Sequence, residues 1–181
     1  MLAIRRAGLS RVAALAAASV AGAGMIASSA LVRVPMWPVP MTLQTLAVLL
    51  IAGTMGLRAG LGSVALYVGA SALGWPPAAG GAAVGGPTTG YLIGLLAEAA
   101  IMGLAVDRVW CGSAPRLFAA VLAATTVVFL PGVAWLAAFW MPSLPAAIAA
   151  GLTPFLIGDA LKVALGFVCL LGLRRRMSPC P

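Results

Sequence analysis

Asp159 and Lys162 are the residues of this chain best suited to polar chemistry. They lie one helical turn apart in an otherwise apolar segment, and the chain holds only three acids in all and no second lysine. An ionisable group at the centre of a bilayer costs roughly 2.5 to 3.5 kcal/mol, so it needs a function or a partner there. Two interpretations stay open. The pair binds a polar ligand, or it is an internal ion pair that fixes its helix to a neighbour, with Glu98 as a second acid near Lys162.

A further group of polar residues stands at the start of two other apolar segments. Its members are Thr42 and Gln44, followed by Thr45, and Gly85, Gly86, Thr88 and Tyr91. The Gln44 amide has to find hydrogen-bond partners in the protein or in a ligand, because burying it without them is costly. The free N–H groups and positive dipole end of a helix start suit a carboxylate ligand, although the threonines are equally suited to plain N-capping.

The composition predicts that an all-α polytopic membrane protein positions these residues. Hydrophobic residues make up 63% of the 181 residues and charged residues only 8%, which leaves too little polar surface for a water-soluble globule. Charges, prolines and glycine clusters divide the chain into a bundle of six transmembrane helices forming a single domain, residues 1–181. The helices are expected at about residues 9–32, 42–57, 59–73, 88–109, 116–140 and 154–173.

The first predicted helix needs a separate argument, because arginines followed by an apolar run are also typical of a secretory signal. The run from residue 12 to residue 32 is longer than the usual signal core and long enough to cross the hydrocarbon layer. A retained first helix is therefore expected.

Two segments between the predicted helices, residues 34–40 and 75–87, are rich in proline and glycine yet carry no charge. Non-helical backbone at membrane depth is tolerated where it is buried in protein or lines a cavity. We therefore predict two outer lid loops over a pocket. Short connectors in the interfacial zone are the alternative.

The arginines predict the orientation of the chain in the inner (plasma) membrane. With a cytoplasmic N-terminus, nine arginines fall at inner helix ends and Arg33 alone falls at the outer side. The nine are Arg5, Arg6, Arg11, Arg58, Arg108, Arg116, Arg174, Arg175 and Arg176. Cytoplasmic loops carry an excess of Lys and Arg, so both termini are predicted to be cytoplasmic.

The same composition argues against several classes of function. The formal charge is +8, but the arginines punctuate apolar segments rather than forming a basic face, so no nucleic-acid partner is expected. Histidine is absent and the cysteines lack metal spacing, so neither a metal site nor an enzyme is expected. A small proton-coupled secondary transporter, with Glu98, Asp159 and Lys162 as a relay, is the alternative function. The lack of an inverted repeat argues against it.

Small residues at four-residue spacing mark two helix faces. Ala13, Ala17 and Ala21 form one such stripe, and Gly90 with Gly94 forms another. Small stripes let helices approach closely. The glycine stripe is expected to pack within the bundle, whereas the alanine stripe serves either internal packing or docking of another membrane protein.

Three motifs in order resemble the BioY family of biotin transporters. They are PVPMTLQTL at residues 38–46, AGG at 79–81 with GPTTGYL at 86–92, and PFLIGDALK at 154–162. The resemblance covers almost the whole chain. It implies the membrane-embedded substrate-binding component of an energy-coupling factor transporter, which captures biotin and works with a transmembrane coupling subunit and two ATPase subunits. No cofactor is expected in this chain, because it lacks a GxxxxGK[ST] phosphate loop.

The resemblance also implies roles for individual residues. Asp159 and Lys162 match the acid and lysine that contact the ureido ring of biotin in the family, and the alanine stripe resembles the surface that docks on the coupling subunit. We expect backbone N–H groups around residues 85–86 to bind the biotin carboxylate.

The chain departs from the family pattern at two places. Residues 77–79 read Pro-Ala-Ala where relatives often carry Val-Phe-Ala, so an aromatic pocket wall is expected from elsewhere, with Trp75 or Tyr91 as candidates. Thr89 stands where many relatives have glycine, which alters how closely the backbone approaches a ligand.

Overall fold

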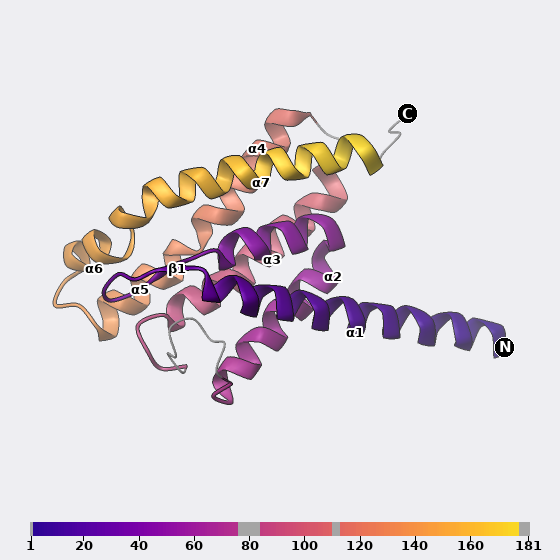
Figure 1. Ribbon diagram of the computed structural model, residues 1–181, viewed down its shortest axis with the longest axis horizontal. Coiled ribbons are helices and arrows are strands. Elements are labelled where there is room, and N and C mark those ends of the chain that lie inside the picture. The colour runs from indigo at the N-terminus through magenta and orange to yellow at the C-terminus, as the bar shows by residue number, and fades with distance from the viewer. Residues whose placement is uncertain (1, 76–83, 110–112, 178–181) are drawn as a thin grey trace.

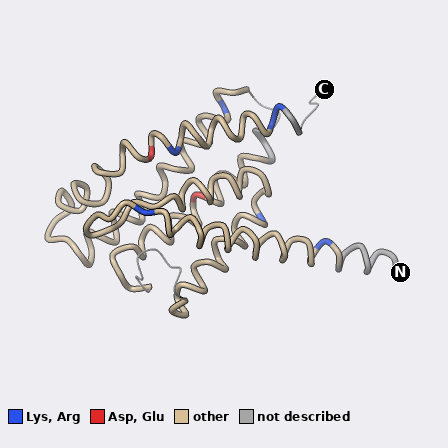
Figure 2. The backbone as a smooth tube through the Cα atoms, in the orientation of Figure 1, with Lys and Arg blue, Asp and Glu red and all other residues tan. Residues whose placement is uncertain are grey.

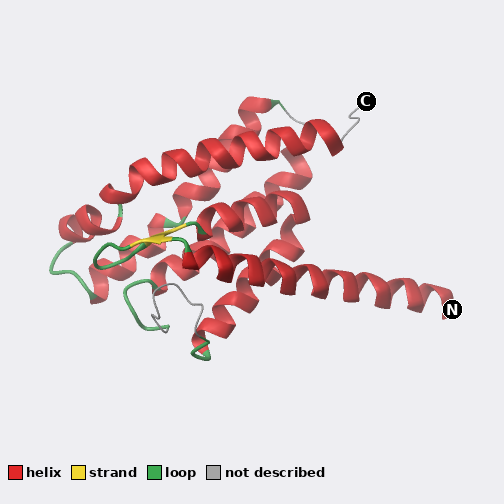
Figure 3. Ribbon diagram, in the orientation of Figure 1, coloured by secondary structure: helices red, strands yellow, loops and turns green. Residues whose placement is uncertain are grey.

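The computed structural model describes residues 2–75, 84–109 and 113–177, and these are mostly helical (Figures 1 and 3). The elements in chain order are α1 (Leu2–Leu31), β1 (Arg33–Val34), β2 (Met41–Thr42), α2 (Gln44–Ala72), α3 (Thr89–Val109), α4 (Ala114–Val127), α5 (Phe129–Phe139), α6 (Leu144–Gly151), the 3-10 turn η2 (Thr153–Phe155) and α7 (Leu156–Met177). Within the described residues, 5 stretches are long and apolar enough to cross a membrane: Ser10–Leu31, Gln44–Ala72, Thr89–Val106, Ala114–Phe139 and Leu144–Arg175.

Helix α1 packs on α2 through small residues. A Cβ on Gly22 would collide with Ser63, and a Cβ on Gly62 would collide with the Ser19 hydroxyl. Apolar burial hardly drives association between helices in lipid, so such close backbone contacts matter more there. The first part of α1 runs beyond the rest of the bundle (Figure 1).

Helix α2 covers two of the predicted helices, and it is broken between them at Gly56. That residue has φ 78° and ψ −178°, a conformation open to glycine but strained for other residues. Ala52 and Gly60 pack against each other across the break, with an added Cβ on Gly60 lying 2.9 Å from the Ala52 Cβ. Eight residues of straight helix would separate them by about 12 Å. The chain therefore turns back on itself within α2 (Figure 1).

Helix α3 packs on α5 through the predicted glycine stripe, as expected. A Cβ on Gly90 would meet the Pro131 carbonyl and the Trp135 side chain, and a Cβ on Gly94 would lie 2.6 Å from the Val128 carbonyl oxygen and 2.8 Å from its Cα. Most of these neighbouring atoms are backbone, and the contacting Trp135 atom is its Cβ, so they cannot rotate away. These two glycines therefore set the distance between α3 and α5.

We expect Gly94→Ala to destabilise the protein by about 1 to 3 kcal/mol, because the new methyl group would overpack this contact. The measurement is the thermal unfolding midpoint in detergent. Gly24→Ala is the matched control, since a Cβ on Gly24 would meet no atom within 4 Å. The control should be neutral or stabilised by up to about 1 kcal/mol, in line with the higher helix propensity of alanine. Equal midpoints for the two variants would contradict the close contact.

The last two predicted helices are divided differently from the expectation. The segment predicted at 116–140 is α4 followed by α5, and Pro131 falls in the first turn of α5, where its missing N–H costs no helical bond. The segment predicted at 154–173 begins at Leu156, because Pro154 lies in η2. The short helix α6 was not predicted, although its N-cap Ser143 accepts a hydrogen bond from the Ala146 N–H at 3.4 Å.

The predicted loop at residues 34–40 is the turn of a small β hairpin. Strands β1 and β2 pair antiparallel, with Arg33 opposite Thr42 and Val34 opposite Met41. Gly158 at the start of α7 lets Met41 pack closely, since a Cβ there would collide with the Met41 sulfur. The hairpin is thereby held against the first turn of α7. Most of the other predicted loop, residues 76–83, lies outside the described residues.

Candidate functional site

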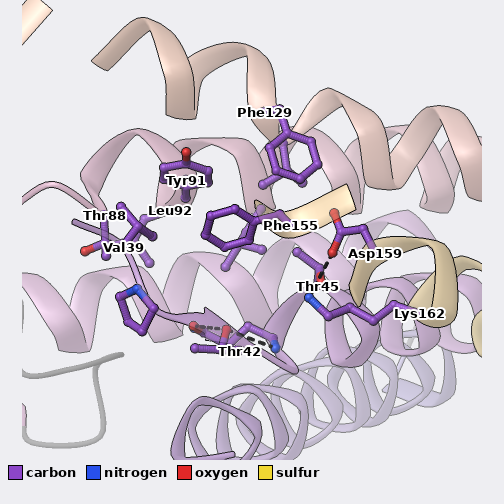
Figure 4. Close-up of a pocket in the computed structure, with 14 residues that line it drawn as sticks. Val39, Thr42, Thr45, Thr88, Tyr91, Leu92, Phe129, Phe155, Asp159 and Lys162 are labelled. Carbon is purple, nitrogen blue, oxygen red and sulfur yellow. Dashed lines mark hydrogen bonds and ion pairs between the residues drawn. The ribbon is translucent and has the colours of Figure 1, made fainter. Parts of the chain in front are cut away.

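A cavity opens between the hairpin, α2, α3, α5, η2 and α7 (Figure 4). About 520 Å³ of space between these elements is not filled by protein atoms, and part of it is open to solvent. The lining residues are Val39, Pro40, Thr42, Gln44, Thr45, Thr88, Tyr91, Leu92, Leu95, Val128, Phe129, Phe155, Asp159 and Lys162. Residues of all three sequence motifs therefore meet at one cavity, the second motif through its part at residues 86–92, while residues 79–81 lie outside the described residues.

Asp159 and Lys162 form an ion pair in this cavity. The Lys162 Nζ donates to Asp159 Oδ1 at 2.9 Å, and both residues are buried. Asp159 lies in the first turn of α7, where the positive end of the helix dipole favours a carboxylate. The ammonium has two further donors, and Asp159 Oδ2 has no hydrogen-bond partner among the described residues. The ion pair lies within α7 and so does not itself fix that helix to a neighbour, whereas ligand binding by the pair, which faces a cavity, stays a prediction.

Gln44 begins α2 at the edge of the same cavity. The Thr42 hydroxyl donates to Gln44 Oε1 at 2.9 Å, which fixes the amide with its oxygen toward β2. The opposite end, Gln44 Nε2, is buried and has no partner among the described residues, and the same holds for the neighbouring Thr45 Oγ1. Leaving such groups unpaired costs about 1 to 3 kcal/mol each.

Three residues that line the cavity therefore carry an unpaired polar atom: an acceptor at Asp159 Oδ2, a donor at Gln44 Nε2 and a hydroxyl at Thr45 that can do either. The arrangement can bind a small polar group that carries both N–H donors and a carbonyl acceptor. The unpaired atoms are thus the strongest structural sign that a ligand completes this site.

Aromatic rings form another wall of the cavity. Tyr91 stacks on Phe155 with ring centroids 6.1 Å apart, and Phe129 meets Tyr91 edge-on at 6.4 Å. The Tyr91 hydroxyl donates to the Gly151 carbonyl at 2.7 Å, which fixes the ring. Figure 4 shows the three rings grouped beside Asp159. Tyr91 was one of the two residues expected to replace the missing aromatic, whereas Trp75, which is 60% exposed, does not line the cavity.

Several predicted residues lie elsewhere. Gly85 and Gly86 do not line the cavity: the Gly85 N–H donates to Thr89 Oγ1 at 2.8 Å, and the Gly86 carbonyl accepts from Trp135 Nε1 at 3.0 Å. The alanine stripe on α1 is exposed along its length, away from the cavity.

Sequence reasoning missed two aromatic members of the site. Phe155 lies in the motif at residues 154–162, four residues before Asp159, so its position in the sequence could have marked it as a site residue. Phe129 lies in an unbroken apolar run and carried no signal in the sequence.

Comparison with known proteins adds independent evidence. The BioY family model matches residues 5–179. A biotin transporter BioY of Thermotoga maritima is 33% identical over 155 residues, covering 83% of this chain and 90% of that protein. Biotin transporter BioY2 of Lactococcus lactis is 29% identical over 161 residues, covering 87% of this chain and 88% of that protein.

A solved structure gives the fold. The crystal structure of the S-component for biotin from an ECF-type ABC transporter matches with a TM-score of 0.77 and 24% identity, covering 92% of this chain and 93% of that chain. The family match spans nearly the full chain, and the motifs that carry it converge on one cavity. The chain therefore belongs to the BioY family.

Proposed function

We infer that this chain binds biotin and is the membrane-embedded substrate-binding component of an energy-coupling factor transporter. The unpaired polar atoms of the cavity are the observation that carries the inference. The biotin ureido ring offers two N–H donors and one carbonyl. A ureido N–H can donate to Asp159 Oδ2, and the ureido carbonyl can accept a hydrogen bond from Gln44 Nε2 or from the Lys162 ammonium. The relatives named as biotin transporters support the same ligand.

The rest of biotin suits the rest of the cavity. Its sulfur-containing ring and apolar tail match the wall of Tyr91, Phe129 and Phe155, because thioether sulfur makes favourable contacts with ring edges. For the tail carboxylate, the Thr88 hydroxyl is the candidate donor near the start of α3, because it lines the cavity whereas Gly85 and Gly86 do not and the Gly85 N–H is bonded to Thr89.

The chain acts in transport and not as an enzyme. Its role is to capture the vitamin in the membrane, while ATP is hydrolysed by two ATPase partners that act through a transmembrane coupling subunit. The alanine stripe Ala13, Ala17 and Ala21 is the proposed docking face for the coupling subunit, which its exposure supports.

The proposed topology is one domain with six membrane crossings in the inner membrane. The two arms of α2 on either side of Gly56 supply two of the crossings. The first residues of α1 and the end of α7 lie at the same end of the bundle (Figure 1), and most basic positions lie toward that end (Figure 2). This arrangement supports cytoplasmic termini. The hairpin and residues 75–87 are the proposed outer lids.

Equilibrium binding to the purified chain in detergent tests the proposed function. We expect biotin to bind with a Kd below about 1 µM, and pentanoate, which carries the acid tail without the rings, to bind at least about 100-fold more weakly. Equal affinity for the two ligands would contradict the role of the polar cluster. A biotin Kd above about 1 mM would contradict the function itself.

A further inference from the structure

Glu98 is a buried carboxylate that the ligand site described above does not use. It lies in α3 with 0% of its surface exposed, and neither Oε1 nor Oε2 has a hydrogen-bond partner among the described residues. Burying a carboxylate without a partner is among the most unfavourable arrangements in a protein interior. Its presence in a membrane-spanning helix therefore calls for a partner in some state of the protein.

The charges that act on Glu98 are those of the ligand site. Asp159 and Lys162 on α7 both influence it electrostatically, one as a like charge and one as an opposite charge. Figure 2 shows acidic positions in red on α3 and on α7. Leu95, one helical turn before Glu98 on α3, lines the cavity together with Asp159 and Lys162, so Glu98 lies next to the cavity on the same helix face. The Lys162 ammonium contacts Asp159 in this structure.

We propose that Glu98 is a positioning residue that accepts the Lys162 ammonium while a ligand occupies Asp159. This rests on the proposed function. A ligand N–H bound to Asp159 satisfies part of that carboxylate, after which Glu98 is the carboxylate with more unmet acceptors. Lysine has a flexible four-carbon stem and three donors, so Nζ can turn between the two acids while α7 stays in place.

The exchange would have two consequences. It would connect α7 to α3 in the ligand-bound state, where the present ion pair lies within α7 alone. It would also hold Asp159 and Lys162 in position for the ureido ring without leaving a buried carboxylate unpaired. Both consequences make ligand affinity depend on Glu98 although Glu98 does not line the cavity.

The test compares the parent chain with Glu98→Gln, Lys162→Met and the double variant. Glu98→Gln keeps the shape of the side chain and removes the carboxyl group. We expect it to weaken biotin binding about 10- to 100-fold in the parent and less than about 2-fold in the Lys162→Met background. Glu98→Asp, which restores the carboxyl group on a shorter stem, should recover part of the lost affinity.

A second readout separates this role from a purely structural one. The ligand-free thermal midpoint of Glu98→Gln should be unchanged or raised, because a buried carboxyl group without a hydrogen-bond partner among the described residues is replaced by an amide of the same shape, while the stabilisation produced by saturating biotin should shrink. A lowered ligand-free midpoint with an unchanged biotin shift would overturn the proposal. So would parent-like affinity of Glu98→Gln, or an equal loss in both backgrounds.

Failure of this inference is distinguishable from failure of the proposed function. If the parent chain binds biotin and Glu98→Gln binds it equally well, the role of Glu98 alone is overturned. If the parent chain does not bind biotin, the proposed function is overturned and this inference with it.

Discussion

Asp159→Asn is expected to weaken biotin binding by at least about 100-fold. A hydrogen bond to a charged partner contributes about 1.5 to 3 kcal/mol, which alone corresponds to about 10- to 100-fold in Kd. The substitution also removes the group that positions the Lys162 ammonium, 2.9 Å from Oδ1, so a second ligand contact is disturbed. Isothermal titration in detergent measures the change.

The same variant should remain folded. Asparagine has nearly the same shape as aspartate, and its amide oxygen can still accept a hydrogen bond from the Lys162 ammonium. Thermal unfolding and size exclusion provide the fold check, and Asp159→Glu, which keeps the charge, should bind better than Asp159→Asn. Unchanged affinity of a folded Asp159→Asn would remove this residue from the site.

Ala17→Leu is expected to reduce biotin uptake by at least about 10-fold in cells that make the complete transporter, while biotin binding to the isolated chain stays the same. Ala17 is exposed on α1, whereas Ser19 and Gly22 on the other side of the helix pack against α2. A small stripe allows a partner helix to approach closely, and a leucine there would hold it away. Uptake of labelled biotin and co-purification of the coupling subunit are the measurements.

Ala119→Leu is the matched control for the docking face. Ala119 is likewise exposed, but on α4. Its uptake should equal that of the parent chain. If Ala17→Leu takes up biotin normally, or if both leucine variants fail alike, the alanine stripe is not the docking face.

The sequence was most informative about where the apolar segments begin and end. Charged residues and Pro/Gly clusters interrupt the apolar runs. The interruption at residues 56–58 was predicted because Gly56 and Arg58 stand there. The structure makes this interruption a break at Gly56 inside one continuous element, α2. A sequence pattern locates such a break but does not tell whether helical hydrogen bonding resumes at once on the far side.

Local geometry within apolar segments was beyond sequence reasoning. The short helix α6 ends at Gly151, where a Cβ would meet Leu136 and the Tyr91 hydroxyl, residues far apart in the chain. No charge or periodicity marks these positions.

The polar part of the site was predictable and the apolar part was not. Polar groups are rare and costly in membrane-spanning segments. This is why the sequence indicated that Asp159, Lys162 and Gln44 each need a hydrogen-bond or ion-pair partner. Phe129 is one apolar residue among many in its helix, and only its contact with Tyr91 and Phe155 gives it a place in the site. The expected contribution of Gly85 came from backbone N–H groups, whose direction a sequence does not specify.

A structure of this chain with biotin bound would test the central claim most directly. The account predicts a ureido N–H within hydrogen-bonding distance of Asp159 Oδ2, with the ring carbonyl near Gln44 Nε2 or the Lys162 ammonium. A bound biotin whose ureido ring contacts neither Asp159 nor Lys162 would contradict it.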